Sequence, residues 1–328
     1  MRRTLLALLA ASPWLAHAAD PTPQQRATAA RLTAEKAAAC VAVQPFYWEL
    51  GNAAQPLVGG KAGEGAPDRR TEMAIASASK WVYAAFAAER RQGQFTADDI
   101  KFLNFQSGYT HYRFCLPNQS VAACQASLIN GRGRKNPATE NRFDYGGGHM
   151  QQHALTMGLG SLWPEGLAFA VRQALAPVLG ADWSFRYTQA MPAGGGVTSA
   201  ADYSRLLRAL MTGQLQLGAL LGTHPVCTNP QVCTNEAIKT PVPETEAWHY
   251  SLGHWVEDDP QVGDGAFSSA GAFGFYPWIS ADKRLYGLVA RDQRQAPATD
   301  DPVTKPGAAS VACGRLIRAA WQAGEPRL

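Results

Sequence analysis

The chain has 328 residues, of which 30 are lysine or arginine and 26 are aspartate or glutamate, a formal net charge of +4. This near balance gives no indication of a nucleic-acid partner, because proteins that bind the phosphate backbone are usually strongly basic. The short basic stretch Arg132-Gly133-Arg134-Lys135 contains a glycine and precedes Asn136-Pro137. We therefore expect it to be a solvated loop rather than a binding patch.

The first residues have the three parts of a secretory signal peptide. Arg2 and Arg3 are followed by the apolar run Leu5–Leu9 and by the small-residue site Ala16-His17-Ala18. Cleavage after Ala18 would leave 28 basic and 26 acidic residues, a formal charge of +2. The apolar run is too short to span a bilayer, and no later stretch is long enough. We expect a mature protein that has no membrane span and is periplasmic or secreted.

All six cysteines follow this signal, and an even count in an exported chain predicts disulfides. The alternative is a set of buried free thiols. Two close pairs would each close a local loop, which leaves the other two cysteines to join the first helix of the mature chain to the last one. The suggested pairs are Cys115–Cys124, Cys227–Cys233 and Cys40–Cys313.

The N-terminal part is predicted to be a helix followed by two strands. Pro23–Val43 is rich in alanine with interspersed charges, as in an amphipathic helix. Pro45–Leu50 has the composition of a strand that ends at the turn Gly51-Asn52, and a short second strand is predicted near Pro56–Gly59.

The next predicted helix starts near Ala76 and ends before Gly93, with Val82 and Phe86 on an apolar face and a charged face from Glu89 onwards. The later predicted elements are a short helix capped by Thr96, the helix Leu167–Leu179, a helix capped by Ser199, the strands His249–Val256, Ala272–Ile279 and Leu285–Ala290, and the helix Ser310–Gln322.

This order predicts an α+β fold of the α/β-sandwich type. An antiparallel sheet would be built from the N-terminal and C-terminal parts of the chain and flanked by helices, with a helical lobe inserted between them. The predicted limits are one domain over 19–328, with the sheet region in 24–75 and 240–328 and the lobe in about 76–239.

Ser77-Ala78-Ser79-Lys80 lies at the start of the predicted helix. A serine and a lysine three positions apart share one helix face, so an amine lies beside a hydroxyl. A lysine whose pKa is lowered by burial can activate that serine as a nucleophile, and the helix N-terminus favours an oxyanion there. The alternative is a helix-capping serine followed by an exposed lysine.

Four further segments follow in a consistent order and complete a resemblance that spans about Phe46 to the C-terminus. With Ser77 and Lys80 they resemble the penicillin-recognising serine hydrolases, in the branch of class C β-lactamases, D-alanyl-D-alanine peptidases and related esterases and amidases. The matching segments are Phe102–Gly108 after the helix, Tyr145-Gly146-Gly147 in place of the Tyr-x-Asn motif, the glycine-rich Ala193–Tyr203, and Ser269–Gly274 in place of the third, strand-borne motif.

The resemblance implies a role for each residue. Ser77 would attack a carbonyl group, Lys80 and Tyr145 would share the work of general base and acid, and the backbone amides of Ser77 and Ala272 would form the oxyanion hole. Positive charge on Lys80 is expected to lower the pKa of Tyr145. The alternative for Tyr145 is a half-buried core or turn residue.

The residues expected to bind substrate are Gly147, His149, Ser269 and Gly271. Two of these, and Ala272 nearby, depart from the family pattern. Gly147 replaces an asparagine, Ser269 a lysine or histidine, and Ala272 a serine or threonine that helps to bind a substrate carboxylate. Losing a cation and a hydroxyl argues for a neutral ester or amide as substrate. Ser268, Ser269 or the nearby Arg291 could partly substitute.

Other site types fit less well. His149 and His153 are four residues apart, but no glutamate follows His149 as in a metal-binding His-Glu-x-x-His helix, so we expect no metal and no cofactor. His149 is still close enough to Tyr145 to line the same cleft. Most of four aromatic residues are expected in the sheet core, with one or two on the pocket wall: Trp48, Trp255, Tyr276 and Trp278.

The sequence therefore predicts an exported serine hydrolase with a small ester, amide or peptide-like substrate. The alternatives are a β-lactamase or D,D-peptidase that acts on cell-wall-like substrates, and a binding protein that keeps this fold without catalysis.

Overall fold

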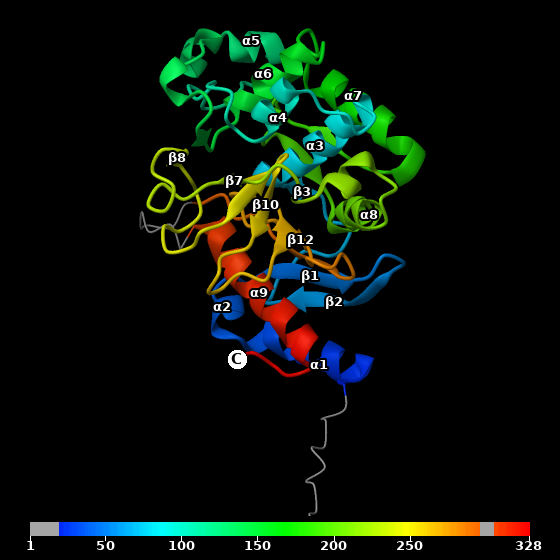
Figure 1. The fold of residues 1–328 in the computed structure, drawn as a ribbon. Coiled ribbons are helices and arrows are strands. Elements are labelled where there is room, and N and C mark those ends of the chain that lie inside the picture. Colours follow the sequence, from blue (N-terminus) through cyan, green and yellow to red (C-terminus); the bar gives the residue numbers. More distant parts are fainter. Residues whose placement is uncertain (1–19, 296–304) are drawn as a thin grey trace, which may run out of the picture.

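The computed structural model describes residues 20–295 and 305–328, so the predicted signal peptide lies outside the described residues. Figure 1 shows a sheet with helices α1 and α9 packed across it and a helical lobe at the end of the molecule opposite the C-terminus. The main sheet has the strand order β2 (Pro56–Ala62), β1 (Phe46–Gly51), β13 (Tyr286–Ala290), β12 (Tyr276–Ile279), β11 (Ala266–Ser268), β10 (His254–Glu257), β9 (His249–Ser251) and β7 (Val226–Cys227).

Every pair of neighbouring strands in this sheet is antiparallel, and strands from both ends of the chain meet where β1 pairs with β13. This confirms the predicted fold class. All residues of β1 and β13 are buried, because α1 and α9 cover one part of the sheet and α8 packs on β12 and β13.

The helices of the described residues are α1 (Pro23–Lys36), α2 (Ala38–Val41), α3 (Ser79–Arg90), α4 (Ala97–Leu103), α5 (Val121–Gln125), α6 (Gly148–Thr156), α7 (Pro164–Leu179), α8 (Ala200–Met211) and α9 (Pro306–Ala323). The first predicted helix is too long, because Ala37 is extended with ψ 134° and separates α1 from α2. The three predicted disulfides are present. Cys40 therefore joins α2, rather than the first helix, to α9.

Helix α3 differs from its prediction as an amphipathic helix. Every residue from Ser79 to Ala88 is buried, so the helix is enclosed on all sides and only its last turn is accessible to solvent. A helix that is apolar all round belongs in the interior of a domain. Ser77 and Lys80 are thus at the start of a helix that runs through the core.

The late strands also differ in detail from the prediction. The predicted strand His249–Val256 is a hairpin, because Leu252 and Gly253 have φ of 41° and 86° and turn the chain between β9 and β10. Only Tyr276–Ile279 of the predicted strand Ala272–Ile279 pairs as β12, whereas Ala272 begins a turn. Strand β11 was not predicted.

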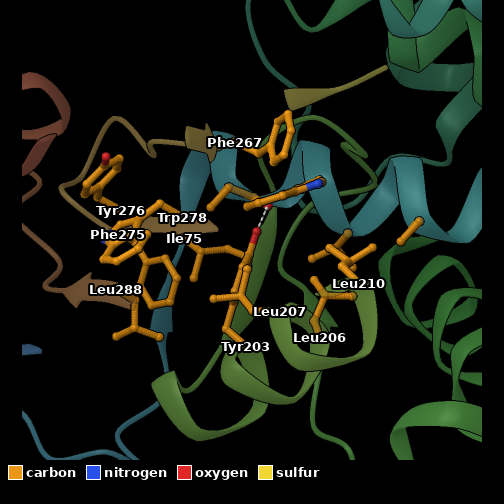
Figure 2. Close-up of a cluster of buried hydrophobic side chains, with 14 of the residues drawn as sticks. Ile75, Tyr203, Leu206, Leu207, Leu210, Phe267, Phe275, Tyr276, Trp278 and Leu288 are labelled. Atoms are coloured by element: carbon orange, nitrogen blue, oxygen red, sulfur yellow. Dashed lines mark hydrogen bonds between the residues drawn. The ribbon is translucent and has the colours of Figure 1, made fainter. Parts of the chain in front are cut away.

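Two small sheets bring distant segments to the start of α3. They are β3 (Met73–Ala74), β6 (Gly196–Thr198) and β5 (Arg186–Tyr187) in one sheet, and the parallel pair β4 (Phe143–Asp144) and β8 (Ala237–Lys239) in the other. Figure 2 shows part of the core beneath this region, in which Tyr203 and three leucines of α8 belong to one cluster with Ile75 and side chains of the sheet. The side chain of Ser199 caps α8 as predicted, accepting a hydrogen bond from the amide of Asp202.

Candidate active site

Ser77 lies in a single 3₁₀ turn, Ala76–Ala78, that leads directly into α3. The hydroxyl of Tyr203 donates to the carbonyl of Ala78 at 2.9 Å, and the hydroxyl of Ser269 donates to the carbonyl of Ser77 at 3.2 Å. Ala76 has φ 42°, which an L-residue adopts at a cost. Helix α8 and the segment after β11 therefore hold the turn in a strained shape that presents Ser77.

The Lys80 side chain is only 4% exposed and has no acidic partner among the described residues. Its Nζ donates to Ser77 Oγ at 2.9 Å and to the carbonyl of Ala193 at 2.8 Å. Burial without a counter-charge lowers the pKa of Lys80 to about 7. A large fraction of Lys80 is therefore uncharged at neutral pH and can accept a proton from Ser77.

The predicted glycine-rich segment packs directly against this turn. The amide of Gly196 donates to Ser79 Oγ at 3.0 Å, and the carbonyl of Gly196 accepts from the amide of Ile75 at 3.0 Å. A Cβ atom on Gly196 would lie 2.5 Å from Ser79 Oγ, so only glycine allows this approach. The same approach brings the carbonyl of Ala193 to Lys80.

Tyr145 follows β4 and is held by a hydrogen bond from its amide to the carbonyl of Lys239. The Lys80 nitrogen lies 4.8 Å from the centre of the Tyr145 ring, and the Trp255 ring stacks on that ring at 5.2 Å. Burial raises the pKa of Tyr145 to about 12, and hydrogen bonding with the side chains of Ser77 and Trp255 acts in the opposite direction. Tyr145 is thus protonated at neutral pH, unlike the tyrosine of lowered pKa expected from the sequence.

Ser77 and Tyr145 open onto a cavity of about 450 Å³. Ala272 lines the same cavity, and its backbone amide makes no hydrogen bond with any described residue. An amide without an internal hydrogen bond that faces the same cavity as Ser77 is available to serve in an oxyanion hole. The remaining wall is largely apolar and includes Val242, Trp248, Trp255, Phe273 and Val311.

The third-motif segment contains no cation. Ser269 is 3% exposed and its hydroxyl donates to the backbone carbonyl of Ser77, so this hydroxyl is not free to bind a ligand. Gly271 lines the cavity, and a Cβ atom there would lie 2.2 Å from the carbonyl oxygen of Ile75. Gly271 is therefore the position that lets this segment approach the backbone just before the Ala76–Ala78 turn. Arg291, considered as a substitute cation, donates to the carbonyl of Val43.

Gly147 and His149 lie behind Tyr145 and do not line the cavity. A Cβ atom on Gly147 would meet the ring of Tyr112 at 2.7 Å, so this ring fills the space that a longer side chain would need. His149 is fully buried between the hydroxyl of Ser107, at 2.8 Å, and the carbonyl of Asp144, at 3.0 Å. Burial lowers the pKa of His149 to about 3, so the ring is a neutral part of the scaffold.

Several contributors to the site were missed in the sequence. The carbonyl of Ala193 is a backbone group that no residue type signals, although the glycines after it mark the segment. Trp248 and Val242 also line the cavity but lie outside the segments that match the family motifs. Trp255 is on the cavity wall, as expected for one or two of the aromatic residues. In the described part of the chain no group of three or more potential ligands could hold a metal ion. No helix of 20–295 and 305–328 has the length and apolarity to cross a bilayer.

Neither a protein-family model nor a curated protein matches the sequence. The structure, however, is similar to EstCE1, a hydrolase with promiscuous acyltransferase activity, with a TM-score of 0.64 and 13% identity over 92% of this chain and 99% of that chain. It is also similar to the D-amino acid amidase of Ochrobactrum anthropi, with a TM-score of 0.62 and 11% identity over 90% of this chain and 98% of the other.

A β-lactamase from Mycobacterium bovis matches with a TM-score of 0.56 and 16% identity, over 85% of this chain and 96% of that one. These identities are low, but the matches cover nearly the whole of each protein. The chain therefore has the fold of the penicillin-recognising serine hydrolases, as the motifs indicated.

Proposed function

We propose that this chain is an exported serine hydrolase that cleaves a small neutral ester or amide through an acyl-enzyme on Ser77. The observation that carries the proposal is the buried Lys80 amine, 2.9 Å from Ser77 Oγ and with no acidic partner among the described residues. A structural lysine at the surface would keep its charge, whereas this one has a pKa of about 7.

The positions of the groups support the following reaction. Lys80 takes the hydroxyl proton as Ser77 Oγ bonds to the carbonyl carbon, and the amides of Ser77 and Ala272 hold the oxygen that becomes negative. When this oxyanion collapses, the bond to the leaving group breaks and Tyr145, kept protonated by its pKa of about 12, supplies a proton to it. Lys80 returns its proton to Tyr145. Water then attacks the acyl carbonyl carbon and passes a proton to uncharged Lys80. When this second oxyanion collapses, the bond to Ser77 Oγ breaks, Oγ takes the proton back from Lys80, and the acid is released.

The substrate class is inferred from the third-motif segment and from the cavity wall. Ser269 is committed to the backbone of Ser77, and the cavity is mostly apolar. Of the three cations that line the cavity, Arg315 is paired with Glu246 and Arg294 with Asp292, whereas Lys305 is exposed just before α9. A neutral acyl group suits such a cavity better than one that carries a carboxylate.

A fluorophosphonate probe tests the nucleophile. Wild type should be labelled on Ser77, and Ser77→Ala should not be labelled. Ser79→Ala is the matched control, because Ser79 is in the same motif but bonds to Gly196, and it should still be labelled. Absence of labelling in the wild type would favour a binding protein, and equal labelling of Ser77→Ala would refute the assignment.

The substrate class is tested by comparing p-nitrophenyl butyrate with nitrocefin. We expect kcat/KM for the ester to exceed that for the cephalosporin by about tenfold or more, since a missing hydrogen bond to a charged group costs about 1.5–3 kcal/mol. Equal or faster nitrocefin turnover would overturn the neutral substrate and favour a β-lactamase or D,D-peptidase.

A further inference from the structure

Four large apolar side chains are exposed around α5, at the end of the helical lobe opposite the C-terminus (Figure 1). Leu128 is 75% exposed, Phe114 and Leu116 are each 45% exposed, and Ile129 is 41% exposed. Single exposed apolar residues need no explanation, but a group of them commonly marks an interaction surface.

The two segments that carry these residues are fastened to each other. The side chain of Asn130, which is 1% exposed, donates to the carbonyl of Phe114 at 3.0 Å and to that of Cys124 at 2.9 Å. Its oxygen accepts from the amide of Arg113 at 2.8 Å, and the Cys115–Cys124 disulfide adds a covalent link. The apolar side chains are therefore presented by a fixed framework.

The segment that carries these apolar residues has charges of one sign only. No acidic residue occurs between Asp99 and Glu140. The exposed side chains of Arg113, Arg132 and Arg134 form no ion pair with any described residue. Glu140, which ends this acid-free stretch, is already paired with Lys135 at 2.6 Å and lies 3.9 Å from Lys101.

We propose that these seven residues, Phe114, Leu116, Leu128, Ile129, Arg113, Arg132 and Arg134, form a docking surface for an anionic phospholipid bilayer. Apolar side chains flanked by arginines suit the boundary between headgroups and acyl chains, where the guanidinium groups bind phosphate and the apolar groups enter the hydrocarbon. A nucleic acid offers nothing to the aliphatic side chains of Leu116, Leu128 and Ile129. On this proposal Arg132 and Arg134 bind phosphate groups in addition to lying in the exposed segment expected from the sequence.

The proposal does not depend on the enzymatic activity and is tested without it. The mature protein is sedimented with large unilamellar vesicles of phosphatidylcholine alone or with 30% phosphatidylglycerol. We expect at least about tenfold stronger partitioning to the anionic vesicles, weakening as salt is raised. Equal partitioning to the two kinds of vesicle, or no binding at low salt, would overturn the proposal.

Two double variants separate the contributions. Arg132→Gln with Arg134→Gln should weaken binding to anionic vesicles about 30-fold, because each basic residue contributes about 1 kcal/mol at such a surface. Phe114→Ser with Leu128→Ser should weaken it about tenfold or more. Matched controls are Arg284→Gln and Val232→Ser, whose side chains are exposed elsewhere, and both should bind as wild type does.

Three results would contradict a bilayer surface. The control variants could weaken binding as much as the double variants. Heparin could compete fully while Phe114→Ser with Leu128→Ser binds normally, which would indicate a site for soluble polyanions. The same apolar variant could instead convert a dimer to a monomer in sedimentation velocity, which would assign the surface to a second copy of the chain.

Discussion

Lys80 and Arg318 are both almost fully buried cations, yet their surroundings are opposite. Among the described residues Lys80 has only the carbonyl of Ala193 and the hydroxyl of Ser77 as hydrogen-bond partners. Arg318 donates to Glu257 at 3.0 Å and to Asp264 at 2.6 Å, and its guanidinium lies 4.7 Å from the centre of the Trp278 ring.

The consequence for charge differs accordingly. A buried cation with neutral partners is stabilised by losing its proton, and the pKa of Lys80 falls to about 7. In the other cluster burial raises the pKa of Glu257, but the guanidinium groups of Arg318 and Arg315 more than offset this and keep it ionised. The unpaired region suits proton transfer, whereas the paired region fastens α9 to the sheet.

Removing the unpaired cation should have the largest effect. We expect Lys80→Met to lower kcat/KM about 1,000-fold or more, as befits loss of a general base, which is about 4 kcal/mol in the barrier. The same change should raise the free energy of unfolding by about 2 kcal/mol at pH 7, because the desolvation of the amine exceeds the cost of leaving the Ala193 carbonyl without a partner. Activity is measured with p-nitrophenyl butyrate and stability by urea unfolding.

Lys283→Met is the matched control for this prediction. Lys283 also donates to a backbone carbonyl, that of Gly218 at 2.9 Å, but its side chain is only half-buried. We expect no gain of stability and normal activity. A Lys80→Met protein that is less stable than wild type, or that keeps its activity, would show that Lys80 is an ordinary structural residue.

Breaking the paired cluster should lower the free energy of unfolding, whereas Lys80→Met should raise it. Glu257→Gln leaves Arg318 and Arg315 with one fewer buried acid, and we expect it to lower the free energy of unfolding by about 3 kcal/mol. Arg284→Gln is the control, because the Arg284–Asp282 contact is exposed and 3.9 Å long, and it should cost less than about 0.5 kcal/mol. Similar urea midpoints for the two variants would mean that the buried cluster does not hold α9 in place.

Much of the fold was predictable because its signals are local. The cap of α8 at Ser199 and the capping box of Thr96 and Asp99 are recognisable from residue type and spacing alone. The β9–β10 hairpin was not, because Leu252 occupies a positive φ in the middle of a run typical of one strand. The turn is stabilised by a tertiary contact, in which the backbone amide of Leu252 donates a hydrogen bond to the side-chain oxygen of Asn104.

The same division applies to the site. Ser77 and Lys80 are three residues apart, so their proximity follows from helical geometry. The ring of Tyr112 against Gly147 and the carbonyl of Ala193 against Lys80 are contacts between segments far apart in sequence. No local pattern encodes such contacts. The pKa of Tyr145 was misjudged for a related reason, since the degree of burial depends on the whole fold.

The smallest predicted effects are the changes of activity and stability with pH that the titration of Lys80 should cause. Only uncharged Lys80 can accept a proton, so kcat/KM should increase with pH along an ascending limb centred near pH 7. At pH 6 it should be about tenfold below its plateau. His149 cannot produce this limb, because its pKa is about 3. His249 could, because its bond to Asp258 raises its pKa, so His249→Gln is the control and should leave the limb unchanged.

The free energy of unfolding should also change as Lys80 titrates, and it should increase with pH. The pKa of Lys80 in the folded protein, about 7, is below the 10.5 of an ordinary lysine, so between these values the unfolded chain binds the extra proton and stability rises with pH. Below pH 7 both states are protonated and the penalty is constant. The stability advantage of Lys80→Met over wild type should therefore shrink by about 1 kcal/mol between pH 7.5 and pH 8.5. An advantage that stays constant across this range would place the pKa of Lys80 near that of an exposed lysine and remove the contrast with Arg318.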